Sequence, residues 1–441
     1  DIIDNGFEGE GIAKIDNFTI FIPGTIKGEK VRVLIVKVLS SHGFGKIVEI
    51  IEKSQARQDV DCNTYKRCGG CNLRHVKYEE TLKMKQNAVQ SLVNKTLKNK
   101  LQVKETVGME NPLHYRNKAQ YPIGINKKGE PVIGVFANRT HEVIPIDNCL
   151  IQNKKSEEIA KFIVEFIKEK NISIYDEKTG KGLVRHIVTK VGIKTGEIMC
   201  VIVINGHKIP NENELVENLK TRYPEIKAIV KNINMKNTNV ILGQENINLY
   251  GNGYIEDILG EYKFKISPLS FYQVNPVQAE KLYNLGVSMA EITKDDVVFD
   301  LYCGIGTISL FMSKFAKKVY GIEIVEEAVK MAKENAESNN VSNTEFFAGD
   351  VEIVLDDLIN NKGIKADVVM FDPPRKGLDK KSIDNILNIR PKKIVYISCN
   401  PATLIRDLAD FENEYDIKTI IPVDMFPFTS HVECCSVLQL K

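Results

Sequence analysis

The alternation of apolar and polar positions along the chain changes from short, turn-bounded runs to longer α/β repeats. Apolar runs at residues 18–24, 29–38 and 43–51 are separated by Gly and Pro, which predicts the short strands of a small β-barrel. From Ile266 onward, helical stretches alternate with apolar runs that read as buried strands, namely residues 297–301, 318–322, 366–371 and 393–398. This alternation predicts an α/β fold with a doubly wound parallel sheet.

The middle of the chain mixes helices and strands without a clear repeat. A basic helix is predicted at about residues 79–98, another helix at 156–170, and strands near 183–191 and 199–204. We therefore expect three domains, 1–55, 56–260 and 261–441, of which the central one is mixed α+β. No apolar run reaches 18 residues and the start is unlike a signal peptide, so we expect a cytoplasmic protein with free thiols and no membrane contact.

Net charge is low but unevenly distributed. The 441 residues include 60 Lys and Arg against 58 Asp and Glu, a net charge of +2, which argues against nucleic-acid binding by bulk charge. Residues 61–130, however, hold 14 basic and 6 acidic residues, a local excess of +8. Such asymmetry points to a polyanionic partner, although a solvated lysine-rich face explains it equally well.

Three polar features follow successive predicted strands of the C-terminal sheet. Gly304 and Gly306 follow the first strand, Glu323 ends the second, and Asp350 ends the segment that comes next, residues 346–349. A third glycine of the dinucleotide fingerprint is missing, because Ser309 stands in its place. Ligands bind at the carboxyl ends of strands in such sheets, so the order of these groups favours an adenosyl cofactor without a pyrophosphate, S-adenosylmethionine rather than a nicotinamide. A plain tight turn is the alternative for the glycines.

Three further segments carry reactive side chains. Asp372 lies in a rigid Phe-Asp-Pro-Pro-Arg segment, which places it beside the cofactor rather than in a helix. Cys399 lies between a strand and a helix, and a helix N-terminus should lower its thiol pKa and favour the nucleophilic thiolate; a small buried hydrophobe is the alternative. Alternation predicts His431 and Glu433 on one face of a strand, with Glu433 either solvated or a general base.

Five ordered segments together resemble the TRAM-domain class I RNA (uracil-C5)-methyltransferases, and the similarity covers the whole chain. They are residues 270–275, 300–306, 371–375, 398–401 and 431–433. The resemblance implies an N-terminal TRAM (OB-like) barrel that binds RNA, a cluster-bearing central domain and a Rossmann-like methyltransferase domain that depends on S-adenosylmethionine.

The resemblance also assigns roles. Cys399 would add to C6 of uracil as nucleophile, and Glu433 would remove the C5 proton as general base. Positions that hold the cofactor would be Gln273, Tyr302, Glu323 and Asp372, with Thr307 and Asp350 within its reach. Because the target base must leave its stack, Phe271 is a candidate stacking platform, with a core aromatic as the alternative.

Four of the nine cysteines form a candidate metal site. Cys62, Cys68 and Cys71 lie within ten residues, and Cys149 stands apart. Four thiolates suit zinc or a [4Fe–4S] cluster, and their spacing does not choose between the two. The resemblance favours [4Fe–4S]. The other cysteines besides Cys399 are expected to be bystanders: Cys200, Cys303, Cys434 and Cys435.

The leading hypothesis is methylation of 23S ribosomal RNA to form 5-methyluridine. The transfer-RNA uracil methyltransferases that the chain resembles generally lack the barrel and the cluster, which favours ribosomal RNA. A transfer-RNA uracil-C5 methyltransferase is the alternative, as is a non-catalytic RNA-binding protein, against which Cys399 and Glu433 argue. Methyl transfer to cytosine C5 is a further alternative, but the chain lacks the second active-site cysteine that is typical of those enzymes. No stable protein partner is implied.

Overall fold

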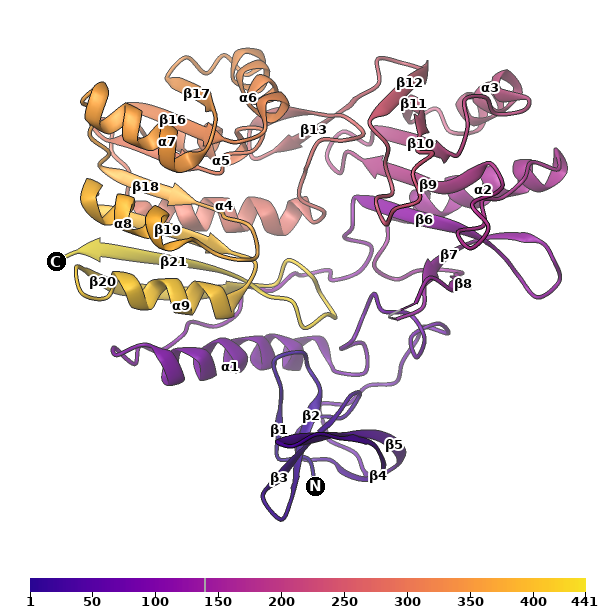
Figure 1. The fold of residues 1–441 in the computed structure, drawn as a ribbon, viewed down its shortest axis with the longest axis horizontal. Helices are drawn as coiled ribbons and strands as arrows, with labels where there is room; N and C mark the ends of the chain where they lie inside the picture. Colours follow the sequence, from indigo (N-terminus) through magenta and orange to yellow (C-terminus); the bar gives the residue numbers. More distant parts are fainter. Residues whose placement is uncertain (139) are drawn as a thin grey trace.

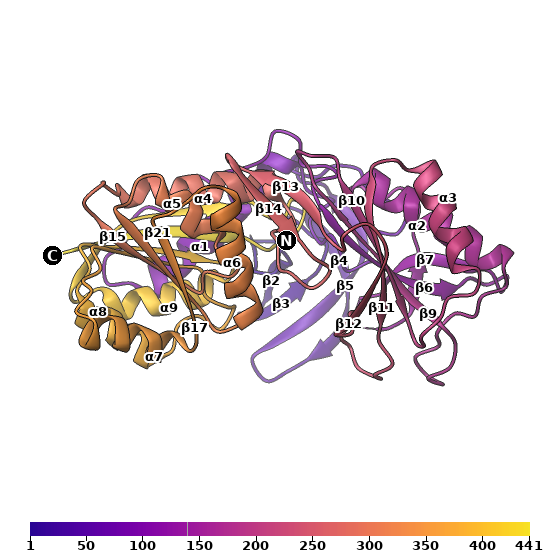
Figure 2. The same ribbon diagram turned by 90° about the horizontal axis from the view of Figure 1, so that it is seen from above.

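The computed structural model describes residues 1–138 and 140–441. Three sheets, each formed by a different part of the chain, make up most of the molecule (Figure 1). The N-terminal sheet lies apart from the two larger ones, which lie side by side in both views (Figures 1 and 2). Within the described residues, no helix combines the length and apolarity that crossing a membrane requires.

The N-terminal sheet contains the short strands that the apolar runs predict. Its order is β1-β2-β3-β5-β4, and its strands are β1 (Asp4–Asn5), β2 (Gly11–Ile15), β3 (Phe18–Ile22), β4 (Lys30–Val38) and β5 (His42–Glu52). The Ile2 amide donates to the Glu29 carbonyl, and the Gly28 amide donates to the Ile2 carbonyl, both at 2.8 Å. These bonds join the chain just before the two edge strands, so the sheet curls around a small core of Ile2, Ile20 and Ile22.

The central sheet has seven strands and is covered by helices on one face. Its order is β12-β11-β10-β9-β6-β7-β8. The strands are β6 (Lys118–Ile125), β7 (Pro131–Phe136), β8 (Val143–Pro145), β9 (Val184–Val191), β10 (Ile198–Ile204), β11 (Ile226–Ile233) and β12 (Glu245–Tyr250). Apolar side chains of α2 (Lys154–Glu169) and α3 (Glu212–Arg222) pack on that face.

Helix α1 (Tyr78–Thr96) belongs to the predicted central domain in sequence but packs elsewhere. Its Val89 and Val93, with Leu97 just beyond it, lie in one core with side chains of the C-terminal domain. Figure 1 shows α1 running beside α9 and β20. The bounds of the three domains stay predictions, but the first helix of the central part is bound to the C-terminal sheet.

The C-terminal sheet is the predicted α/β unit. Its order is β17-β16-β15-β18-β19-β21-β20. The strands are β15 (Val297–Leu301), β16 (Lys318–Glu323), β17 (Thr344–Ala348), β18 (Val368–Phe371), β19 (Lys393–Ser398), β20 (Tyr415–Val423) and β21 (Glu433–Leu440). The first five are parallel, and β21 runs antiparallel to both neighbours. The α/β prediction is therefore confirmed, with an antiparallel pair added at one edge.

Helices between these strands cover both faces of the sheet. They are α4 (Pro276–Ala290), α5 (Thr307–Ser313), α6 (Glu326–Ser338), α7 (Val351–Asp356), a π-helical turn at Asp357–Asn361, α8 (Lys380–Ile389) and α9 (Pro401–Phe411), and the hairpin β13 (Ile255–Leu259) and β14 (Tyr262–Ile266) precedes them. The strand order reverses between β15 and β18, and such a reversal opens a crevice at the carboxyl ends of the strands.

Candidate active site

A cavity of about 780 Å³ opens at the carboxyl ends of β15, β16 and β18. All six predicted cofactor positions line it: Gln273, Tyr302, Thr307, Glu323, Asp350 and Asp372. They come from separate segments that the sheet order brings to one edge. The cavity is thus walled by carboxylates, an amide and aromatic side chains, a lining suited to an adenosyl ligand with hydroxyl and amino groups.

The turn between β15 and α5 needs left-handed backbone. Tyr302, Gly304 and Gly306 have φ of 65°, 54° and 80°. At Gly306 a Cβ would lie 3.0 Å from the Phe346 ring, so a side chain there meets both strain and a packed neighbour. The turn therefore brings backbone, rather than side chains, close to the cavity.

Glu323 fixes this turn as well as lining the cavity. Its carboxylate accepts the Gly304 amide at 3.1 Å and the Val325 amide at 3.0 Å. Each carboxylate oxygen keeps a further lone pair for a ligand hydroxyl. Asp350, by contrast, is exposed and accepts the Glu352 amide at 3.0 Å as the N-cap of α7.

Ser309 stands where a third glycine was sought, and its hydroxyl explains the difference. It donates to the buried Asp300 carboxylate at 2.5 Å. Burial, together with the nearby charges of Asp372 and Glu323, raises the pKa of Asp300 to about 7. Sequence reasoning did not single out Asp300, although a carboxylate inside an apolar strand is the signal that could have found it.

Cys399 lies in the tight turn between β19 and α9, as predicted. The Asn400 side chain accepts the Ala402 amide at 3.1 Å and so caps α9. Its amide nitrogen donates to the Arg375 carbonyl at 3.1 Å. The turn that carries Cys399 is therefore bonded to the segment that carries Asp372 and Arg375.

The predicted lowering of the Cys399 pKa is wrong. Burial and the negative charges of Glu433 and Asp372 raise the pKa of the Cys399 thiol, and the Arg375 guanidinium offsets only part of this rise. The local helix N-terminus is outweighed because the thiol is partly buried and two carboxylates from other strands lie near it.

Asp372 and Glu433 form a close pair of carboxylates. Burial raises the pKa of both, and the charge of Asp372 adds to the rise at Glu433. Glu433 is only 4 % exposed and is the first residue of β21. His431 is exposed and lies before that strand, so the expectation that both share one strand face is wrong. The strand starts only where pairing with β20 begins.

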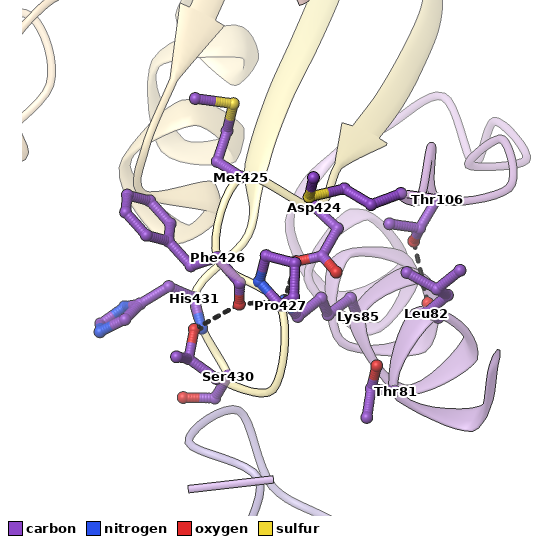
Figure 3. A network of polar contacts seen from close by, with 12 residues as sticks. Thr81, Leu82, Lys85, Thr106, Asp424, Met425, Phe426, Pro427, Ser430 and His431 are labelled. Carbon is purple, nitrogen blue, oxygen red and sulfur yellow. Dashed lines mark hydrogen bonds and ion pairs between the residues drawn. The ribbon is translucent and has the colours of Figure 1, made fainter. Parts of the chain in front are cut away.

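The loop before Glu433 is anchored to α1 by buried polar contacts (Figure 3). The Lys85 ammonium lies 2.5 Å from the Asp424 carboxylate and donates to the Phe426 carbonyl at 3.2 Å. The Tyr78 hydroxyl donates to the same carboxylate at 2.8 Å. Both charged groups are buried, so the loop position depends on a helix far away in sequence.

Phe271 lies at the cavity and is 73 % exposed, which excludes the core alternative. Its segment is held from the central domain, since the Asn117 side chain donates to the Gln273 carbonyl at 3.0 Å. The Gln273 side chain lies near the buried Tyr283, whose pKa burial raises and Gln273 lowers in part. The exposed ring therefore sits on a fixed segment.

The four predicted cluster cysteines are half-buried and lie within each other's electrostatic reach. The pKa of the Cys71 thiol is raised to about 12 by burial and by the charges of Cys149, Cys68 and Cys62. Within residues 1–138 and 140–441, however, no three His, Cys, Asp or Glu side chains are placed closely enough to hold a metal ion. The four thiols are suitable ligands for an iron–sulfur cluster, but their sulfur atoms are not arranged around a common centre. The four expected bystanders are buried: Cys200, Cys303, Cys434 and Cys435.

The fold and the cavity define an S-adenosylmethionine-dependent methyltransferase. The family model "tRNA (Uracil-5-)-methyltransferase" matches residues 77–441, and the TRAM domain model matches residues 1–48. The chain belongs to this family of RNA (uracil-5) methyltransferases, with a TRAM domain at its N-terminal end.

Relatives match over nearly the full chain. An uncharacterised RNA methyltransferase of Clostridium acetobutylicum is 50 % identical, covering 98 % of this chain and 94 % of the relative. One from Caldanaerobacter subterraneus is 46 % identical, covering 100 % and 97 %. The solved tRNA (uracil-54, C5)-methyltransferase of Pyrococcus abyssi, in complex with S-adenosyl-L-homocysteine, has a TM-score of 0.79 and 27 % identity, covering 99 % of each chain.

Proposed function

We propose that this protein methylates C5 of uridine in 23S ribosomal RNA and forms 5-methyluridine. The observation that carries the chemistry is the convergence of Cys399, Asp372 and Glu433 on one point beside the cavity. A nucleophile next to a carboxylate pair is what substitution at an unreactive ring carbon requires.

The residues present fit S-adenosylmethionine. Glu323 and Asp350 offer carboxylate oxygens for hydroxyl and amino groups, and Gln273, Tyr302 and Asp372 line the rest of the cavity. When bound, the cofactor supplies the methyl group that C5 accepts. Its positive sulfonium would be favoured by the surrounding carboxylates.

The chain's own residues perform the remaining steps. The Cys399 sulfur forms a bond to C6, and the displaced electron pair moves onto C5 and O4 of the ring. After C5 is methylated, Glu433 removes its proton. The released electron pair re-forms the C5–C6 double bond and the sulfur–C6 bond breaks, which restores Cys399.

Cys399 must first lose its own proton, because its pKa is raised. The candidate acceptors of this proton are the two carboxylates near the thiol, Asp372 and Glu433. Their pKa values are also raised. A carboxylate that titrates closer to neutrality is a better proton acceptor than an ordinary one. The carboxylate pair therefore accepts a proton twice: from the Cys399 thiol at the start and from C5 at the end of the reaction.

Ribosomal RNA is the preferred substrate because the chain resembles family members that combine the barrel with four cysteines. The barrel alone does not distinguish ribosomal-RNA from transfer-RNA uracil methyltransferases, because the Pyrococcus abyssi transfer-RNA enzyme aligns with 99 % of this chain. The family description and that relative favour transfer RNA as the second candidate.

The test supplies labelled S-adenosylmethionine with unmodified 23S ribosomal RNA or unmodified transfer RNA, followed by nucleoside analysis. Label in 5-methyluridine from 23S RNA alone is expected. Label only in transfer RNA would select the second candidate, and label in neither would contradict uridine methylation. A Cys399→Ala variant is the matched control for each RNA.

We also propose a [4Fe–4S] cluster held by Cys62, Cys68, Cys71 and Cys149. Four thiols that influence one another electrostatically support it, because thiolates are the ligands that hold iron–sulfur clusters. Bound there, the cluster supplies a cross-link between two loops and no redox step. An anaerobic preparation with about four irons per chain is expected; a colourless, zinc-containing protein would contradict it.

None of the nine cysteines forms a disulfide within the described residues, which supports the proposal of a reducing, cytoplasmic location.

A further inference from the structure

We propose that Arg116 and Lys118 form a phosphate-binding site for the RNA backbone, next to the uridine pocket, on the face of the central sheet that no helix covers. The proposal rests on the proposed function in one respect, namely that the substrate is RNA. It assigns the contact with the backbone beside the reacting nucleotide to two residues outside the C-terminal domain.

The strand pattern decides which way these side chains face. In β6, Ala119, Tyr121 and Ile123 pack into the core with α2 and α3. Because side chains alternate along a strand, Lys118 and Gln120 face the opposite side. There Lys118 is the register partner of Lys190 in β9.

Positive charge collects on this face without counter-charge. Arg116, Lys118 and Lys190 are absent from every ion pair formed among the described residues. The pKa of Lys118 is lowered by burial and by Arg116, and that of Lys190 is lowered to about 7 by burial and by Lys118. Crowded, partly buried cations without carboxylates are costly unless an anion binds them.

Only two of the three cations are available to a ligand. The Lys190 ammonium already donates to the Ser267 carbonyl at 2.7 Å and to the Ser270 carbonyl at 2.9 Å. Lys118 makes no side-chain hydrogen bond within the described residues, and the Arg116 Nε is buried without a partner there. Both side chains are half-buried, so they remain open to solvent.

The site adjoins the reacting centre. Lys190 bonds to one end of the segment that carries the exposed Phe271, and Asn117, between the two cations, bonds to Gln273 in the same segment. A nucleotide whose base enters the pocket at Phe271 would therefore have its backbone beside Lys118 and Arg116.

The charge distribution favours a nucleic-acid backbone over a small free anion. Arg116 and Lys118 lie within the stretch 61–130 that carries the local excess of +8, and both side chains are partly exposed at the edge of a face that is otherwise packed against the C-terminal domain. Arg and Lys that contact phosphate give affinity and position without reading the base. We therefore expect a salt-sensitive contact that does not depend on sequence.

The test compares Lys118→Gln and Arg116→Gln with Lys220→Gln, which removes a lysine of α3 on the covered side of the same sheet. Binding of an unmodified 23S ribosomal RNA transcript is measured over a range of salt concentrations. Each of the first two variants should weaken binding about tenfold, as expected for loss of one charged hydrogen bond. Each should also lower the slope of log K against log salt by about 0.7 to 0.9.

Gln120→Glu is a second test variant. It leaves Arg116 and Lys118 unchanged and adds a negative charge on the same face of the sheet. It should weaken RNA binding, while S-adenosylhomocysteine binding and the unfolding midpoint stay at the wild-type values in all variants. Affinities and slopes equal to those of Lys220→Gln in all three variants would overturn the site. If the wild-type protein methylates no uridine and these variants still lose RNA affinity, the proposed function fails and the site stands.

Discussion

At the scale of single residues, the site is governed by three charges around one thiol. Burial raises the pKa of Cys399, the charges of Glu433 and Asp372 raise it further, and Arg375 opposes them. Cys399 is therefore a poor nucleophile until a proton leaves this group of side chains. The carboxylate pair that suppresses the thiolate also supplies the base that the reaction needs.

Glu433→Gln should trap the reaction after methyl transfer. An amide of nearly equal size cannot remove the C5 proton, so the sulfur–C6 bond persists. We expect a covalent RNA–protein band that survives denaturing electrophoresis and is absent from Cys399→Ala. Normal turnover by Glu433→Gln would rule out its role as base.

The same substitution should stabilise the protein in a pH-dependent way. The folded pKa of Glu433 lies above the unfolded value of 4.5, so the unfolded state ionises first as pH rises. Wild-type stability therefore falls between these two pKa values, by about 1.4 kcal/mol for each unit of difference. Urea unfolding should show Glu433→Gln more stable than wild type at pH 8 and similar to it near pH 4. A gain that is the same at both pH values would contradict the raised pKa.

At the scale of elements, the chain segments that build the site come from distant parts of the sequence. The apolar runs predicted β15 and β19 with their observed bounds, and the motifs after them reached one edge of the sheet. The rise in the Cys399 pKa could not be predicted locally, because it comes from burial and from carboxylates that only the folded sheet brings close to the thiol. Likewise, the sequence predicted helix α1 but not the sheet it packs against, nor that Lys85 of this basic helix is buried.

Lys85→Met should therefore cost much more stability than its position on a basic helix suggests. Removing the ammonium leaves the Asp424 carboxylate buried and unpaired, which costs about 3–5 kcal/mol. Lys83→Met is the matched control, because Lys83 is an exposed lysine of the same helix that pairs with Glu80 and should cost less than about 1 kcal/mol. Equal unfolding free energies for the two variants would exclude a structural role for the buried pair.

At the scale of the whole molecule, the C-terminal sheet, the central sheet and helix α1 contribute different parts of the candidate site. The C-terminal sheet carries the cavity, the central sheet holds the segment of Phe271 and Gln273, and α1 ties the Glu433 loop in place. Sequence motifs located the cavity residues. The contacts between domains could not be predicted, since they pair side chains that share no motif.

Cys149→Ser should lower the cluster content without abolishing the chemistry of Cys399. The loop of Cys149 is already held by Glu157, which accepts the Asn148 and Cys149 amides at 2.6 and 2.8 Å. We expect reduced iron and weaker RNA binding, with S-adenosylhomocysteine binding unchanged. Iron content equal to that of wild type would remove Cys149 from the proposed ligands; Cys200→Ser is the control.

The most direct measurement is the transfer of a labelled methyl group to uridine C5 in unmodified 23S ribosomal RNA, read as 5-methyluridine by nucleoside mass spectrometry. We expect label in 5-methyluridine with the wild-type protein and none with Cys399→Ala. Label at another atom or base, or the same yield from Cys399→Ala, would contradict uridine-C5 methylation through Cys399.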